Sequence, residues 1–158
     1  MLSLILALKF VHMITVAVMF GTWLGIAMFM LFAHRMGHTS VVALISALVV
    51  RAEMWVMVGA VVLQPLIGFP LALAIGSSMS AYWLEVSIGI YVAVVLIWMS
   101  SLLIEMRIRR LSKDAAVAKA PLPPSYRRLF WLWSVLTAAG LMGMIAIMAL
   151  MVWQPEWT

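Results

Sequence analysis

Residues 6–23 read LALKFVHMITVAVMFGTW, and this stretch decides the fold class. Apart from Lys9 and His12, its side chains are apolar or small, and the apolar run continues to about residue 33. A helix needs roughly 20 apolar residues to cross a bilayer. We therefore expect a membrane-spanning helix. The run is not expected to be a cleaved signal peptide, because it lacks a preceding basic segment and a small-residue cleavage site.

The rest of the chain has the same character. Of its 158 residues, 67% are hydrophobic and only 9% are charged, and the mean hydropathy is +1.19. The pattern predicts an all-α protein, a four-transmembrane-helix bundle in a single integral membrane domain covering residues 1–158. The expected helices are about 2–33, 39–76, 81–111 and 125–153. The chain has no cysteine, which excludes disulfides, thiolate metal sites and thiol catalysis.

The basic residues predict the topology. Most of them flank or lie in the connection between the third and fourth helices: Arg107, Arg109, Arg110, Lys113, Lys119, Arg127 and Arg128. By the positive-inside rule this connection is cytoplasmic, which puts both termini on the outer (periplasmic) side. We expect a multi-pass protein of the plasma (bacterial inner) membrane. Its partner is the lipid bilayer rather than nucleic acid, because the positive charge is confined to the loops.

The second helical pattern is too long for one crossing. Residues 39–76 would span about 57 Å at 1.5 Å per residue, against a hydrocarbon core of about 30 Å. We interpret 39–52 as a cytoplasmic or interfacial extension, with Arg51 and Glu53 as an anchor pair at the boundary, and Pro65 and Pro70 as kinks. Five tryptophans fit interfacial belts: Trp83, Trp153 and Trp157 at one surface, Trp131 and Trp133 near the other.

His12 is the residue that suggests a function. It lies about ten residues, or about 15 Å, from the outer end of the first helix, near the middle of the bilayer. An imidazole at this depth needs partners for its nitrogens. Either it forms a hydrogen bond to a neighbouring helix, or it is the metal ligand that binds the iron of haem b.

Small residues lie at the same depth on the other three helices. They include Gly68, Gly89 and Gly143, which would leave room for a planar cofactor between helices. The alternative is ordinary small-residue packing of transmembrane helices. Met144 or Met148 could supply a sixth haem ligand, but the spacing selects neither.

Two charged residues near the outer surface complete the candidate cofactor site. Lys9 either extends toward the headgroups or binds a cofactor propionate or a quinone oxygen, and Glu85 is the expected carboxylate partner of Lys9. His34 and His38 have the i, i+4 spacing of a metal-binding pair. No carboxylate or cysteine lies near them, so we interpret them as solvated loop histidines.

Three segments resemble one family. LKFVHMITVAVMFGTWLG (8–25), an Arg before the second span followed by Pro and Gly (Arg51, Pro65, Gly68), and WLEVSIGIY (83–91) are similar to HemJ-type proteins and to related uncharacterised four-helix bacterial membrane proteins. The resemblance implies haem b binding at His12, and oxidation of protoporphyrinogen as the activity. The lysine that HemJ-type proteins carry on the third helix corresponds here to Ser87, which is not a haem ligand.

These features leave three functional hypotheses. The leading one is a haem b protein that transfers electrons between a membrane quinone or partner subunit and an outer-side acceptor. The others are a cofactor-free subunit of a larger respiratory membrane complex and a HemJ-like protoporphyrinogen oxidase. A homo-oligomer is compatible with each. No hydrolase or phosphoryl-transfer motif is present.

Overall fold

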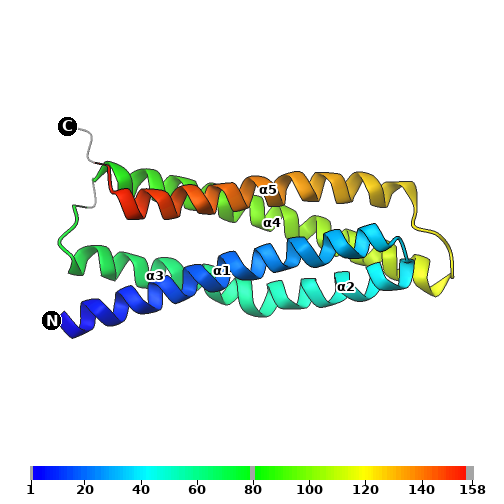
Figure 1. Ribbon diagram of the computed structural model, residues 1–158, viewed down its shortest axis with the longest axis horizontal. Coiled ribbons are helices and arrows are strands. Elements are labelled where there is room, and N and C mark those ends of the chain that lie inside the picture. The colour runs from blue at the N-terminus through cyan, green and yellow to red at the C-terminus, as the bar shows by residue number, and fades with distance from the viewer. Residues whose placement is uncertain (1, 79–80, 156–158) are drawn as a thin grey trace.

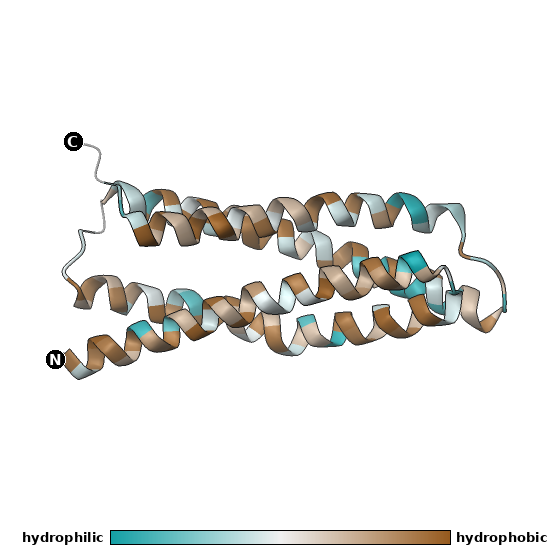
Figure 2. Ribbon diagram, in the orientation of Figure 1, coloured by the Kyte–Doolittle hydropathy of each residue, from teal (hydrophilic) through white to brown (hydrophobic). Residues whose placement is uncertain are grey.

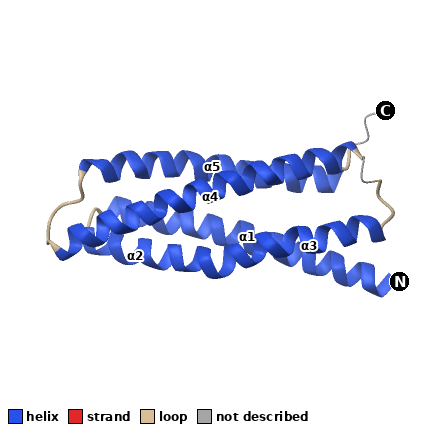
Figure 3. Cartoon of the chain, turned by 180° about the vertical axis from the view of Figure 1, so that it is seen from behind, coloured by secondary structure: helices blue, strands red, loops and turns tan. Residues whose placement is uncertain are grey.

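The computed structural model describes residues 2–78 and 81–155, and the prediction of four long helices is confirmed. They are α1 (Leu2–Met36), the span formed by α2 (Thr39–Ala52), the π-helical segment η1 (Glu53–Met57) and α3 (Val58–Ala74), then α4 (Tyr82–Val117) and α5 (Pro124–Trp153). The described residues contain no strand. The helices lie side by side in one elongated bundle (Figures 1 and 3).

The bundle has two different ends. The N-terminal end of α1 and the C-terminal end of α5 lie at the same end of the bundle (Figure 1), and we call this the terminal end. The opposite end carries the turn at 37–38 and the connection at 118–123, and we call it the loop end. At the turn, Gly37 adopts φ +70, a left-handed conformation that glycine takes without steric cost and that ends α1.

The helices pack as two pairs that separate toward the terminal end (Figures 1 and 3). α4 and α5 pack on each other closely, α2 packs on both α1 and α4, and α3 packs on α1. The backbone of α3 does not pack closely on α4 or α5. In the terminal half, the α1/α3 pair therefore meets the α4/α5 pair mainly through side chains, and we call this contact the seam.

All four spans are longer than a hydrocarbon core. α1 has 35 residues and α4 has 36, which correspond to more than 50 Å of helix, against about 30 Å of hydrocarbon. Figure 2 shows hydrophobic residues along most of the bundle, with hydrophilic residues gathered toward the loop end. Because only Lys9 and Glu85 are charged in the terminal part of the described helices, we expect the bilayer to cover that part and the loop end to project beyond it.

Tryptophans form much of the core rather than two belts. Trp23, Trp98 and Trp133 are buried. The predicted belt position is wrong for Trp133, 2% exposed, and for Trp83, 8% exposed, because both face neighbouring helices. The other two described belt residues, Trp131 and Trp153, are exposed as expected, and Trp157 lies outside the described residues.

One glycine makes room for the most deeply buried tryptophan. A Cβ atom added to Gly140 on α5 would lie 1.9 Å from Trp23 Cη2, and Trp23 is 0% exposed. The indole therefore packs directly on the backbone of α5, which brings α1 against α5 at this level.

Candidate functional site

His12 forms a hydrogen bond across the α1–α3 contact. Its ring is half-buried, and the Nε2 atom of Gln64 lies 3.2 Å from the His12 Nε2 atom. With the amide as donor, His12 Nε2 is the acceptor and the ring proton is on Nδ1. Neither His12 Nδ1 nor Gln64 Oε1 has a hydrogen-bond partner. The pair is therefore joined by one bond, while two buried polar atoms are left unpaired.

Gly68, one turn after Gln64, provides the space that the His12 ring occupies. A Cβ atom at Gly68 would lie 3.3 Å from His12 Cε1 and 3.6 Å from His12 Nδ1. The imidazole thus lies directly against the backbone of α3, with Nδ1 on that side.

The other two candidate glycines lie away from His12. A Cβ at Gly143 would be 2.5 Å from Val94 Cγ2, so this glycine brings α5 close to α4. Gly89 is exposed and has nothing within 4 Å of its Cβ position. These two glycines were chosen because they lie at the same depth in the bilayer as His12. Depth alone does not determine which face of its helix a glycine lies on.

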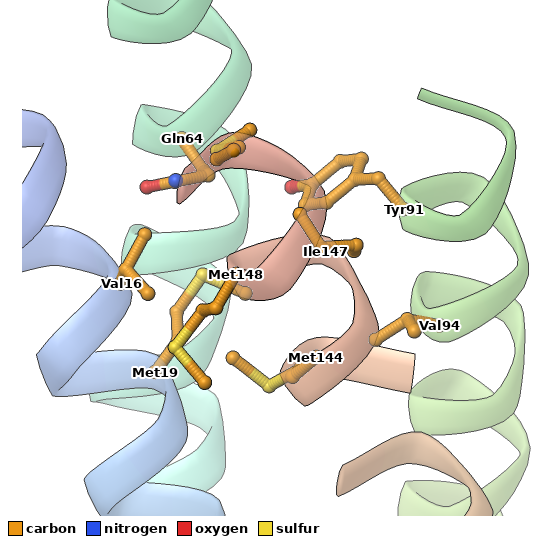
Figure 4. Close-up of a pocket in the computed structure, with 9 residues that line it drawn as sticks. Val16, Met19, Gln64, Tyr91, Val94, Met144, Ile147 and Met148 are labelled. Carbon is orange, nitrogen blue, oxygen red and sulfur yellow. The ribbon is translucent and has the colours of Figure 1, made fainter. Parts of the chain in front are cut away.

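A small apolar cavity lies in the seam next to Gln64 (Figure 4). Its volume is about 30 Å³, which is room for about two water molecules. Val16 and Met19 from α1, Tyr91 from α4 and three methionines of α5 line it. The side chains of Met19, Met144 and Met148 converge there (Figure 4). Methionine is the most adaptable apolar side chain, and its thioether is a soft metal ligand.

Tyr91 bridges the seam by compensating for a proline. Pro65 has no N–H, so the carbonyl of Val61, four residues earlier, lacks its helical donor. The Tyr91 hydroxyl donates to that carbonyl oxygen at 2.6 Å. In the membrane such a freed carbonyl needs an internal partner, and here the partner comes from α4.

Lys9 and Glu85 are both exposed, on α1 and α4. In the described part of the chain no ion pair joins them. The expected link between the first and third spans is therefore not formed, and the role of either residue beside a cofactor stays a prediction.

His34 is not a solvated loop histidine, so that interpretation was wrong. It lies in the last turn of α1, and its ring stacks on Phe130 with centroids 3.9 Å apart. His34 Nδ1 is also 3.1 Å from the hydroxyl of Tyr126. His38, by contrast, is exposed, and its Nδ1 atom approaches only the Met36 carbonyl.

The interpretation of Glu53 as a surface anchor was also wrong. Arg51 is exposed, but Glu53 is 0% exposed at the start of η1, next to the equally buried Glu105 of α4. Two buried carboxyl groups therefore meet inside the bundle, and Glu105 was not among the expected site residues.

A sequence signal for this pair exists in the spacing of buried positions. The buried positions of α4 recur at intervals of three and four residues, through Trp98, Ser101, Glu105, Ile108 and Ser112. Such a stripe marks the inward face of a helix, and Glu105 lies on it. The neighbouring arginines Arg107, Arg109 and Arg110 lie on exposed positions, and they concealed the stripe.

Comparison with protein families identifies the family of this chain. The family model described as "Predicted integral membrane protein (DUF2269)" matches residues 6–155. No curated protein and no solved structure matches the chain. The match includes most of the first span and all of the other three, and it agrees with a multi-pass integral membrane protein whose apolar helices contact lipid.

Proposed function

The chain belongs to this family of integral membrane proteins, and we propose that it is a haem b protein with His12 as an iron ligand. It transfers electrons between a membrane quinone or a partner subunit and an outer-side acceptor. We further propose that it resides in the bacterial inner membrane with both termini in the periplasm. The observation that carries the proposal is the position of His12, whose Nε2 is bonded to Gln64 at the edge of a methionine-lined cavity.

The two nitrogens of His12 are not equivalent as ligands. Nδ1 lies against the α3 backbone at Gly68, so Nε2 is the nitrogen available to a metal. Binding there requires the Gln64 amide to leave Nε2. Met144 or Met148, which line the cavity across the seam, would offer a thioether as a second ligand. When bound, haem iron supplies one-electron transfer, and the protein supplies the ligands and the apolar surroundings.

The donor atoms fit this cofactor, but the space must be made. A cavity of about 30 Å³ is far smaller than a porphyrin. Its walls include four methionines, which change rotamer readily, and α3 is not closely packed on α4 or α5. A macrocycle would therefore enter by displacing methionine side chains along the seam rather than by opening a helix pair.

The second candidate is a cofactor-free subunit of a larger membrane complex. The existing hydrogen bond favours it, because the 3.2 Å contact between Gln64 and His12 already links α1 to α3. Interhelical hydrogen bonds of this kind stabilise transmembrane bundles by about 0.6 kcal/mol on average. In this case His12 would contribute to folding and to nothing else.

An absorption spectrum of the purified protein, oxidised and reduced, tests the first proposal, with a haemochrome assay to count haem per chain. We expect near-stoichiometric haem b that is lost in His12→Ala. His38→Ala is the matched control, since His38 is an exposed histidine at the loop end. Gln64→Leu should retain haem, because the amide must leave Nε2 when iron binds.

The cofactor-free candidate predicts a different set of results. The protein would be colourless when prepared from cells with ample haem. His12→Ala and Gln64→Leu would then lower the unfolding temperature to a similar extent, because each removes the same hydrogen bond.

Oxidation of a porphyrinogen stays a prediction from the resemblance alone. Ser87, at the position of the HemJ-type lysine, is buried, and its hydroxyl donates to the Trp83 carbonyl of its own helix at 2.6 Å. The test is whether the gene restores haem synthesis in cells that lack protoporphyrinogen oxidase. Failure in cells that produce the protein would exclude this activity.

A further inference from the structure

Glu53 and Glu105 form a second polar site, separate from His12. Both are 0% exposed, and their carboxyl groups lie side by side. Glu53 is the first residue of η1, and Glu105 lies twelve residues before the end of α4. That places the pair about 18 Å inside the loop end, near the level where the bundle enters the hydrocarbon layer.

The hydrogen bonds around this pair are incomplete. The Trp133 indole donates to Glu105 Oε1 at 2.5 Å. The remaining three carboxyl oxygens, both of Glu53 and Oε2 of Glu105, have no partner. The Trp98 indole lies beside the Glu53 carboxyl, yet its Nε1 also lacks a partner, although Trp98 is only 6% exposed. The site therefore has more acceptors than donors.

No positive charge of the described residues compensates the pair. Arg51 and Arg107, near the two carboxyls in sequence, are exposed and form no ion pair with them. On α1, the histidines His12 and His34 contact Gln64 and Tyr126 instead. The groups from α4 and α5 that face the pair are the uncharged indoles of Trp98 and Trp133. Two buried carboxylates without a counter-ion would be very costly in free energy.

We propose that Glu53 and Glu105 are a proton-binding site in which the two carboxyl groups share a proton. One proton completes the network after small side-chain adjustments. Trp98 N–H donates to one Glu53 oxygen, the other Glu53 oxygen carries the proton and donates it to Glu105 Oε2, and Trp133 N–H donates to Glu105 Oε1. Every unpartnered atom of the cluster then has a partner. This proposal does not depend on haem at His12.

Infrared difference spectroscopy of the full chain in detergent or lipid tests the proposal. At neutral pH we expect a carboxylic-acid C=O band that shifts in D₂O. Glu53→Gln and Glu105→Gln should each remove or shift the band. Glu85→Gln should leave it unchanged, because Glu85 is an exposed glutamate at the terminal end. Absence of the band from the folded wild-type protein, or a band insensitive to both inner substitutions, would overturn the proposal.

A bound cation is the alternative occupant, and two measurements distinguish it. Elemental analysis of the purified protein should find no stoichiometric divalent metal. The double variant Glu53→Gln/Glu105→Gln should unfold within a few degrees of the wild type, because two amides have nearly the shape of the carboxyl pair and can hydrogen-bond to each other as the proton-sharing pair does. One metal per chain that is lost in the double variant, together with a large loss of stability, would show a cation site instead.

Discussion

At the scale of single residues, the contact between Gly140 and Trp23 gives the sharpest prediction. Gly140→Ala would place its Cβ where the Trp23 ring lies, and this ring is 0% exposed. Overpacking of this kind costs about 1–3 kcal/mol. We expect a lower unfolding temperature in detergent. Intrinsic tryptophan fluorescence during heating measures this temperature.

Two further variants make this test specific. Gly89→Ala is the matched control, because its added Cβ meets nothing within 4 Å and alanine favours helix. Its unfolding temperature should stay the same or rise. Trp23→Phe should recover much of the stability lost in Gly140→Ala. Additive losses in the double variant would show that the two residues do not interact.

Some single residues were located correctly from the sequence, and others were not. His12 could be placed from its depth, since helix rise is constant, and its neighbour Gly68 was among the glycines at that depth. Arg51 and Glu53 were expected to form a surface pair because they lie two residues apart, although residues i and i+2 of a helix do not face each other. His34 was expected in a loop because the first helix was expected to end at about residue 33. In the structure α1 continues three residues further, to Met36, and includes His34.

At the scale of helices, Tyr91 and Pro65 should be energetically coupled. Tyr91→Phe removes the donor to the Val61 carbonyl that Pro65 left without its helical N–H. We expect a loss of about 1 kcal/mol in the free energy of unfolding. In a Pro65→Ala background, residue 65 supplies the missing N–H, so Tyr91→Phe should cost much less there. The four free energies form a double-mutant cycle.

Equal costs of Tyr91→Phe in the two backgrounds would contradict the compensation.

The helices themselves could be predicted well because long apolar runs dominate the sequence. The expected boundaries agree with α5 within one residue at its start and at its end. The third span was expected to end at about 111, within the basic segment that precedes the connection. Ser112 and Ala115 are buried and continue the inward stripe beyond residue 111, in a helix that ends at Val117. The sequence EMWVM (53–57) does not predict a π-helical segment, since it contains neither proline nor glycine.

For the whole molecule, the predicted topology can be tested with single cysteines, because the chain has none of its own. Cysteines at Ser3 and Gln154, both at the terminal end, should react with an impermeant thiol reagent added to intact spheroplasts. A cysteine at Lys119, in the loop-end connection, should react only after the membrane is opened.

The fold alone requires both ends of the chain to be on one side, whereas the charge distribution predicts which side. Labelling of Lys119→Cys in intact spheroplasts, with protection of the two terminal positions, would reverse the orientation and leave the bundle unchanged. Labelling of Ser3→Cys but not Gln154→Cys would contradict the four-span arrangement itself.

The π-helical segment determines where the length of the second span can change. A regular helix turns by about 100° per residue, whereas the wider turn of η1 holds one more residue in nearly the same rotation. Gln64 and Gly68 therefore face His12 as they would in an uninterrupted α-helix with one residue fewer. Inserting or deleting one residue in the regular helix at 58–63 would rotate both residues away from His12. Removing one residue within η1 would leave their orientation unchanged, so η1 is the part of the span where the number of residues can change without loss of the His12 contact.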